Sequence, residues 1–212
     1  SQLWFGLLSA ASNSALELAT GIQSVVGGEI VGIDTENKRM LHYANDFNFK
    51  HIDFQPPFGS LDYLDVLQFA VNQYGAKTII VDSMSHEHEG DGGLIASHEA
   101  EMERMAGSDF GKRERVKMLA WNKPKQNRRA LLNGIVRLQA NVIFCFRAKS
   151  TSKPIKNAQT GKQEVVAMGY MPIAGEEFVY EQTINCLLLP SSNGVPTWRS
   201  DEPGERAMMK LP

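Results

Sequence analysis

Two strand-like runs in this sequence each lead to an acidic side chain. Residues 78–81 form a β-branched run that stops at Asp82 and Ser83, and the run 29–33 is followed within three residues by Glu36. Continuous isoleucine and valine are typical of buried parallel strands, and open α/β sheets bind ligands at the carboxyl ends of such strands. We therefore predict that Asp82 and Glu36 lie at one functional site. Two alternatives stay open: Asp82 caps the next segment, and Glu36 is an exposed carboxylate at the start of a helix.

Basic side chains follow a third run of this kind. The apolar run 141–146 leads into Arg147 and Lys149. Strand residues two positions apart share a face, so both cations are predicted to point at one ligand. Acidic and basic groups on one sheet edge suit phosphoryl transfer, in which cations neutralise the transferred group and a carboxylate orients the attacking water. The alternative is a pair of solvated cations at the end of a strand.

The elements that would position these residues alternate along the chain as a doubly wound sheet requires. Strands are predicted at residues 3–8, 29–33, 50–54, 78–81, 141–146 and 183–189, and helices at residues 14–25, 61–74, 94–106 and 131–138. Ser60 is the predicted N-cap of the second helix, and Gly75 its stop. Residues 150–169 contain a turn signal and predict a hairpin or a mobile loop. We expect one α/β domain over residues 1–212, with a mainly parallel central sheet flanked by helices and a β-rich C-terminal edge.

Composition agrees with an enzyme-sized domain outside the membrane. The 212 residues are 42% hydrophobic and carry a net charge of −2, enough to bury one substantial core. Cys145 and Cys186 both lie in apolar runs, which favours reduced core thiols in a cytosolic protein. No run approaches the ~20 apolar residues of a membrane span, and no charged-then-apolar leader opens the sequence.

Residues 112–129 are strongly basic although the chain is slightly acidic overall. This segment has a single acid, Glu114, and Trp121 near its middle. Its basic residues are Lys112, Arg113, Arg115, Lys117, Lys123, Lys125, Arg128 and Arg129. Such density predicts contacts with a nucleic-acid backbone, and Trp121 is expected to stack on a base. The alternative is a solvated helix whose apolar residues, Trp121 among them, face the core.

A metal site is a third possibility. Residues 86–89 read His-Glu-His-Glu, and His98 and Glu99 follow, so ligands for zinc or manganese are present. This pattern would make the protein a metal-dependent hydrolase. Spacing argues against it, because H-x-H brings both rings together only on a strand, and Gly90 indicates that the chain is already leaving the sheet. Glu87 is the reserve candidate for activating water.

Several motifs together resemble the phage and prophage AAA-type ATPases, which have a RecA-like P-loop NTPase core. They are Ile-Asp-Thr-Glu at 33–36, Ile-Val-Asp-Ser-Met-Ser-His-Glu at 80–87, His-Glu-Ala-Glu-Met-Glu-Arg-Met at 98–105, Ala-Trp-Asn-Lys-Pro-Lys at 120–125, Val-Ile-Phe-Cys-Phe-Arg-Ala-Lys at 142–149 and Leu-Leu-Leu-Pro at 187–190. The resemblance runs along nearly the whole chain. It implies a RecA-like domain that binds ATP and Mg²⁺ and serves phage DNA recombination or replication in the cytoplasm of a bacterial host.

The resemblance also implies roles for individual residues. Glu36 matches the catalytic glutamate that polarises water, and Asp82 matches the acid that holds magnesium. Ser83 is a neighbouring hydroxyl ligand or a strand-end cap, and Arg147 and Lys149 match the positions that sense the γ-phosphate. The expected partners are ATP, single-stranded DNA, recombination or replication proteins, and further copies of the chain.

One departure from that family concerns the phosphate-binding loop. The family has G-x-x-x-x-G-K-[ST] between its first strand and first helix, but residues 6–16 contain no lysine. Ala11 stands at the lysine position and Ser12 at the magnesium-binding hydroxyl. The predicted phosphate-binding segment is Ser9, Ala10, Ala11, Ser12 and Asn13. Either the site is degenerate, or a glycine-rich loop is missing between Leu8 and Ser14. In the first case the protein is a nucleotide-free scaffold that binds DNA or a protein partner.

Overall fold

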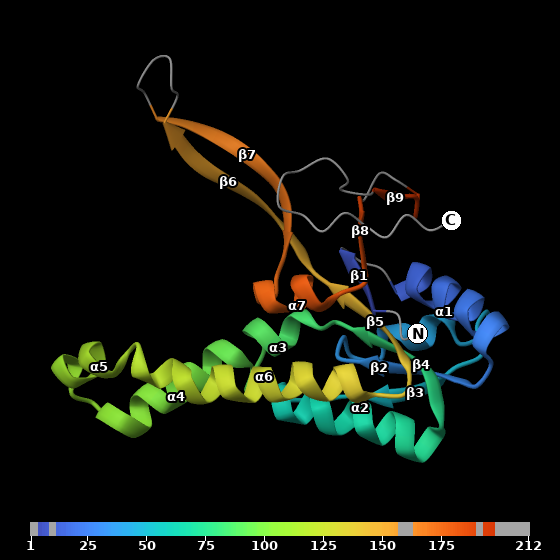
Figure 1. Ribbon diagram of the computed structural model, residues 1–212, viewed down its shortest axis with the longest axis horizontal. Helices are drawn as coiled ribbons and strands as arrows, with labels where there is room; N and C mark the ends of the chain where they lie inside the picture. Colours follow the sequence, from blue (N-terminus) through green and yellow to red (C-terminus); the bar gives the residue numbers. More distant parts are fainter. Residues whose placement is uncertain (1–3, 9–11, 157–162, 190–192, 198–212) are drawn as a thin grey trace.

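The computed structural model describes residues 4–8, 12–156, 163–189 and 193–197, and it has a parallel central sheet flanked by helices (Figure 1). The strand order is β3-β2-β4-β5-β1-β8-β9, in which the first six strands are parallel and β9 is antiparallel to β8. These strands are β1 Trp4–Leu8, β2 Glu29–Asp34, β3 Lys50–Asp53, β4 Ala76–Asp82, β5 Asn141–Phe146, β8 Ile184–Leu188 and β9 Pro196–Thr197. The predicted mixed α/β class and the mainly parallel sheet are confirmed.

Helices cover both faces of the sheet. The helices are α1 Ser12–Val26, α2 Ser60–Tyr74, α3 Ser85–Glu89, α4 Leu94–Ala106, α5 Phe110–Val116, α6 Asn122–Arg137 and α7 Glu176–Glu181, with short 3-10 segments η1 Arg39–Tyr43 and η2 Leu119–Trp121. Helix α1 packs on one face, and α2 and α6 pack together on the other. Two peptide bonds are cis, Pro56–Pro57 and Asp82–Ser83.

The starts of helices α6 and α2 differ from the prediction. Helix α6 begins at Asn122, upstream of the predicted residue 131, because Pro124 falls in the first turn, where a missing N–H costs nothing. Ser60 is not the N-cap of α2; Gly59 is, and its N–H donates to the Asp62 carboxylate at 3.2 Å. The Ser60 hydroxyl instead donates to Glu87 at 2.6 Å.

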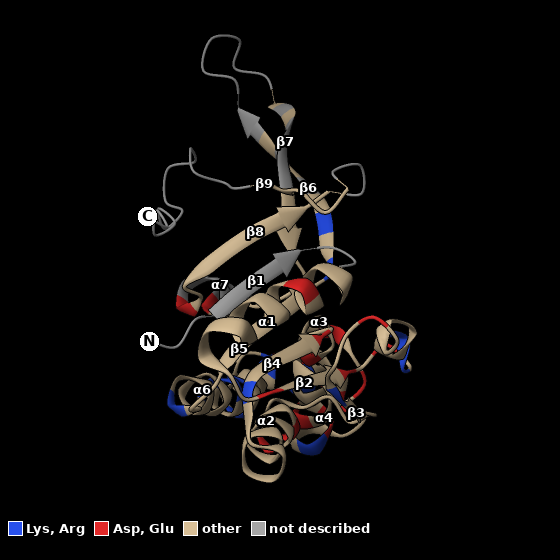
Figure 2. Cartoon of the chain, turned by 90° about the vertical axis from the view of Figure 1, so that its right-hand side faces the viewer, with Lys and Arg blue, Asp and Glu red and all other residues tan. Residues whose placement is uncertain are grey.

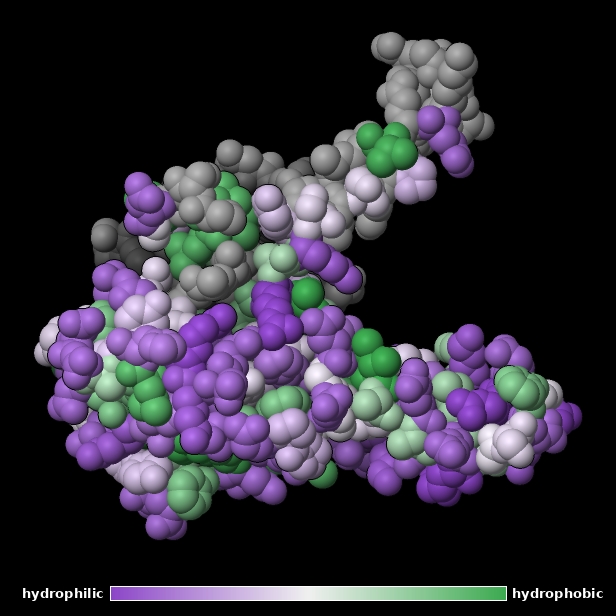
Figure 3. Space-filling view, turned by 180° about the vertical axis from the view of Figure 1, so that it is seen from behind, coloured by the Kyte–Doolittle hydropathy of each residue, from purple (hydrophilic) through white to green (hydrophobic). Residues whose placement is uncertain are grey.

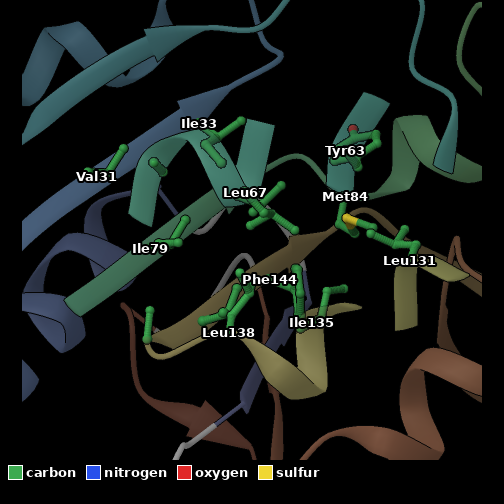
Figure 4. Packing of buried hydrophobic residues seen from close by; sticks show 14 of the residues in the cluster. Val31, Ile33, Tyr63, Leu67, Ile79, Met84, Leu131, Ile135, Leu138 and Phe144 are labelled. Atoms are coloured by element: carbon green, nitrogen blue, oxygen red, sulfur yellow. The ribbon is translucent and has the colours of Figure 1, made fainter. Parts of the chain in front are cut away.

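The core has two layers because side chains alternate along each strand. Val31, Ile79 and Phe144 belong to the layer beneath α2 and α6, where Leu67 and Leu131 pack against them (Figure 4). A second layer lies beneath α1 and includes Cys145 and Cys186. Both cysteines are buried free thiols, as predicted. A sheet that is buried on both faces needs continuous apolar strands, which explains the runs visible in the sequence.

Two parts extend beyond the sheet. The hairpin predicted at residues 150–169 is present as β6 Ala148–Lys156 paired antiparallel with β7 Gln163–Pro172 in a separate sheet. Helices α4 and α5, with η2 and the start of α6, form a helical extension that projects from the body (Figures 1 and 3). Within the described ranges, no helix is long and apolar enough to cross a membrane.

The strand order creates a switch point between β5 and β1. The connection after β1 leads through α1 to β2, whereas the connection after the neighbouring β5 leads to β8 on the opposite side of β1. Ligands of open α/β sheets bind at the carboxyl ends of the strands where such connections diverge. The carboxyl edge near β4, β5 and β1 is therefore the first place to look for a site.

Candidate functional site

Asp82 and Ser12 meet at this edge. Ser12 begins α1, and its hydroxyl donates to the Asp82 carboxylate at the end of β4. Asp82 is 4% exposed, and burial raises its pKa, although the Ser12 hydrogen bond and the charge of Arg39 act in the opposite direction. Arg39 Nη2 lies 3.6 Å from Asp82 Oδ2. The structure thus brings together the two residues predicted as magnesium ligands and adds Arg39, which the sequence analysis had missed.

Glu36 and Arg147 form a second pair at the same edge. Arg147 Nη2 donates to Glu36 Oε1 at 2.7 Å and lies 3.0 Å from His86 Nε2. Burial lowers the pKa of His86, and the Arg147 charge lowers it further. A neutral imidazole with a free Nε2 lone pair accepts the Arg147 hydrogen bond, so His86 helps to hold the guanidinium against Glu36. Figure 2 shows acidic and basic residues mixed around α3 and beside β2 and β3.

Asp34 and Thr35 fix the position of Glu36. The Asp34 carboxylate accepts the N–H of Glu36 and the N–H of Met40, each at 2.8 Å, and lies 3.2 Å from His51 Nε2. Thr35 N donates to the carbonyl of Asp82 at 2.8 Å, and Ser83 N donates to Thr35 Oγ1 at 2.7 Å. The ends of β2 and β4 are therefore locked to each other. The predicted alternative, an exposed carboxylate at the start of a helix, does not fit, because the Glu36 side chain is only 16% exposed.

Ser83 and Lys149 differ from their predicted placement as ligands. The Ser83 hydroxyl donates to the Cys145 carbonyl at 3.3 Å and accepts from Ser85 N at 3.2 Å, which favours the strand-end cap over the ligand. The shared-face argument for Arg147 and Lys149 is wrong, because the chain leaves β5 before Arg147 and Lys149 belongs to β6 of the separate hairpin sheet.

The predicted phosphate-binding segment is only partly described. Ser9, Ala10 and Ala11 lie outside the described residues. Asn13 is exposed, and its side chain donates to Glu17 on the next turn of α1 at 3.1 Å. Ser12 is thus the described member of this segment that contacts the site.

A buried ion pair between Glu87 of α3 and Arg128 of α6 contradicts two predictions. Arg128 donates from Nε to Glu87 Oε1 at 3.2 Å and from Nη2 to Glu87 Oε2 at 2.5 Å, and the two side chains are 5% and 1% exposed. Glu87 also accepts from Ser60, so it is committed to the interior and is not available to activate water at the edge. Arg128 is likewise wrong as a DNA contact, because its guanidinium is enclosed. It also lies 3.7 Å from Glu177 of α7.

The histidines do not gather around one point. His86 faces Thr35 and Arg147, whereas His88 Nδ1 lies 3.1 Å from Arg128 Nη2. His98 Nε2 lies 2.9 Å from the Lys117 carbonyl. Over the ranges that the structure describes, no group of three or more His, Cys, Asp or Glu residues is placed to hold a metal ion, so the metallohydrolase alternative has no ligand set there.

The basic segment spans α5, η2 and the start of α6 in the helical extension. Trp121 is partly buried and stacks on His98 with ring centroids 3.9 Å apart and a 13° tilt, so one face of its indole is covered. Lys125 Nζ lies 6.0 Å from the Trp121 ring, and Lys123 pairs with Glu101 at 3.1 Å. The exposed basic residues of segment 112–129 are Lys112, Arg115, Lys117, Lys123, Lys125 and Arg129, while Arg113 is half-buried.

Phe110 is the residue of this surface that the sequence analysis missed. It begins α5 and is 85% exposed, directly beside the basic residues. Met118 and Leu119 are 78% and 55% exposed, and Figure 3 shows hydrophobic side chains among hydrophilic ones on the extension. The available signal was Asp109, which caps α5 by accepting from Lys112 N at 2.9 Å and thereby sets Phe110 at the first turn. Phe110, Met118 and Leu119 therefore expose apolar side chains next to the basic residues of the segment.

Comparisons with known protein families and curated proteins do not assign this chain to a family. No protein-family model matches the chain, and no curated protein matches it.

Proposed function

We propose that the carboxyl edge of the sheet binds ATP with magnesium and hydrolyses it. The observation that carries this proposal is the pairing of the Ser12 hydroxyl with the buried Asp82 carboxylate at the start of α1, next to the Glu36–Arg147 pair. These are the residue types that phosphoryl transfer requires, and they lie beside the switch point of a parallel sheet. The resemblance to phage ATPases with a RecA-like P-loop NTPase core supports the same reading.

The donor set fits a magnesium ion held together with a nucleotide. Magnesium is usually bound through one or two carboxylates, waters and substrate phosphates, and not by an all-protein cage. Asp82 and Ser12 supply two hard oxygen atoms for it. When bound, the ion would neutralise phosphate charge. The N-terminus of α1, a helix of 15 residues, adds N–H groups and a positive dipole that favour an anion there.

Glu36 and Arg147 have complementary roles in this proposal. The Glu36 carboxylate orients the attacking water, because its backbone is fixed by Asp34 and its side chain is only partly buried. Arg147 neutralises charge on the transferred group. The two side chains pair with each other at 2.7 Å, so each must exchange this partner for a ligand atom during turnover.

The test is isothermal titration of the chain with ATP, in the presence of magnesium and again with EDTA. Wild-type protein should release binding heat that is reduced by EDTA, and Asp82→Asn should lose the magnesium-dependent part. Ser24→Ala is the control on the last turn of α1, since Ser24 is exposed and its hydroxyl donates to the Gly21 carbonyl, at the end of the helix opposite to Ser12. An absence of binding heat at saturating ATP would refute the nucleotide site and favour the alternative, a nucleotide-free scaffold that binds DNA or a protein partner.

The helical extension favours a second function, binding of single-stranded DNA. The observation that supports this function is the exposed basic surface of α5, η2 and the start of α6, together with the exposed Phe110 at the start of α5. Cations follow a phosphate backbone, and an exposed aromatic ring stacks on bases of any sequence. DNA-linked ATP hydrolysis in phage recombination or replication is the role that joins both surfaces. Fluorescence anisotropy of a labelled oligonucleotide tests it, and an absence of binding at low salt would leave an ATPase that acts on a protein.

A further inference from the structure

The first residue of η1, Arg39, brings a cation to the acidic centre of the edge. Arg39 Nη2 lies 3.6 Å from Asp82 Oδ2, and its side chain is 43% exposed, so one side of the guanidinium faces solvent. Asp82 has only Ser12 and Arg39 as side-chain partners among the described residues. Arg39 therefore stands beside the same two atoms, Ser12 Oγ and Asp82 Oδ2, that form the proposed magnesium site.

The position of Arg39 is built into the fold. Its neighbour Met40 is fully buried and donates its N–H to Asp34 Oδ2 at 2.8 Å. Met40 lies against Gly32 of β2, where an added Cβ would come within 2.2 Å of the Met40 sulfur. Because a side chain at position 32 would displace the end of the Met40 side chain, Gly32 lets Met40 pack directly on β2. The buried Met40 next to it and the Asp82 carboxylate, 3.6 Å away, therefore hold Arg39 at the end of β4.

The segment that begins the site has no positive charge of its own. The first 37 residues contain no lysine or arginine, and the first basic residues are Lys38 and Arg39. Arg147, another cation at this edge, already pairs with Glu36 at 2.7 Å and with His86 at 3.0 Å. Lys38 points elsewhere and pairs with Asp53 at 3.3 Å. A polyphosphate beside Ser12 would thus meet Arg39 as the cation nearest to Asp82.

We propose that Arg39 is a phosphate-binding residue, which supplies in this chain the positive charge that the segment between β1 and α1 lacks. The ligand class is the polyphosphate of a nucleoside triphosphate, so the inference rests on the proposed function. A magnesium ion held by Asp82 would balance the charge of that carboxylate, and Arg39 would then be free to donate to phosphate oxygens. The guanidinium suits this task because it donates two parallel hydrogen bonds to a phosphate.

Titration calorimetry with ATP and with inorganic pyrophosphate, both with magnesium, tests the inference. Arg39→Gln should weaken both affinities by about tenfold or more, the effect of one charge-assisted hydrogen bond. Arg39→Lys should recover part of the loss. Lys38→Gln is the matched control: it removes the same charge from the adjacent residue and should change the affinity less than about twofold. Urea unfolding without ligand should show that Arg39→Gln, which also removes a counter-ion from the buried Asp82, is still fully folded under the conditions of the titration.

Three outcomes are distinguishable. An Arg39→Gln protein that binds ATP as tightly as wild type, or more tightly, overturns the inference and makes Arg39 a counter-ion of Asp82 alone. A loss for ATP without a loss for pyrophosphate also overturns it, because Arg39 would then act on the shape of the site and not on phosphate. A wild-type protein that binds neither compound refutes the proposed function itself.

Discussion

Replacing Arg128 by alanine should destabilise the protein strongly, although Arg128 lies within a run of surface cations. Its guanidinium makes two hydrogen bonds to Glu87, and the two side chains are 5% and 1% exposed. The substitution leaves the Glu87 carboxylate buried with Ser60 as its remaining donor among the described residues. A buried charge without its counter-ion is far less stable than the same charge in water.

The expected size follows from this burial. Removal of one partner of a buried ion pair costs about 3 to 5 kcal/mol of unfolding free energy. For a chain of this length, each kcal/mol shifts the melting temperature by about 2 to 4 °C. Arg128→Ala should therefore lower the melting temperature by about 6 to 20 °C. Urea unfolding followed by circular dichroism gives the free energy directly.

Arg129 provides the matched control. It is the next residue of α6, carries the same charge and is exposed. Arg129→Ala should change stability by less than about 0.5 kcal/mol. The double variant Arg128→Ala/Glu87→Ala should cost less than the sum of the two single substitutions, because each single substitution strands the other charge. If Arg128→Ala costs less than about 1 kcal/mol, or no more than Arg129→Ala, the buried pair is not the structural element described above.

Three further predictions concern chemistry, pH and DNA. Glu36→Gln should keep ATP affinity but lower hydrolysis by about 10² or more, as measured by phosphate release, because general-base catalysis contributes that much; an unchanged rate would move water activation to another residue. Burial lowers the pKa values of His86 and His88 below the ordinary 6.5, and the charges of Arg147 and Arg128, respectively, lower them further. Below pH 6.5 the unfolded chain therefore binds more protons than the folded protein, so the contribution of these histidines to the unfolding free energy is fully present above pH 6.5 and falls as the pH drops. His86→Asn and His88→Asn should each flatten the dependence of the unfolding free energy, measured with urea, on pH between pH 7 and pH 5. An unchanged dependence would contradict the lowered pKa values of the two histidines. Binding of single-stranded DNA should weaken with salt by roughly 0.7 log units per log unit for each neutralised phosphate; Arg129→Ala should flatten this slope, whereas Phe110→Ala should weaken binding at an unchanged slope, and a salt-insensitive affinity would exclude backbone contacts.

The strand ends could be predicted because they depend on local sequence. The β-branched runs before Asp82 and Glu36 report burial on both faces of a parallel sheet, and the carboxyl ends of parallel strands share one edge. Ser12 came from the resemblance, in which it takes the position of the magnesium-binding hydroxyl. Its hydrogen bond to Asp82 joins residues 70 positions apart and was not predicted.

Other features depend on contacts that local sequence does not record. Arg39 follows β2 and reaches Asp82 at the end of the neighbouring strand β4, and Trp121 stacks on His98 of a different helix. Arg128 is a more instructive case. Pro124, Arg128, Leu131 and Ile135 are the buried residues of α6 and recur at helical spacing. Extending the predicted helix back from Leu131 would have placed Arg128 on the buried face, but the density of charge hid this period.

The most direct test of the proposed site is a crystal structure of the chain with magnesium and a non-hydrolysable ATP analogue. We predict phosphate density at the start of α1 beside Ser12, with the ion bound by Asp82 and the terminal phosphate near Glu36 and Arg147. Nucleotide density at another place on the molecule, or its absence at saturating analogue, would contradict the assignment of this edge as an ATP site.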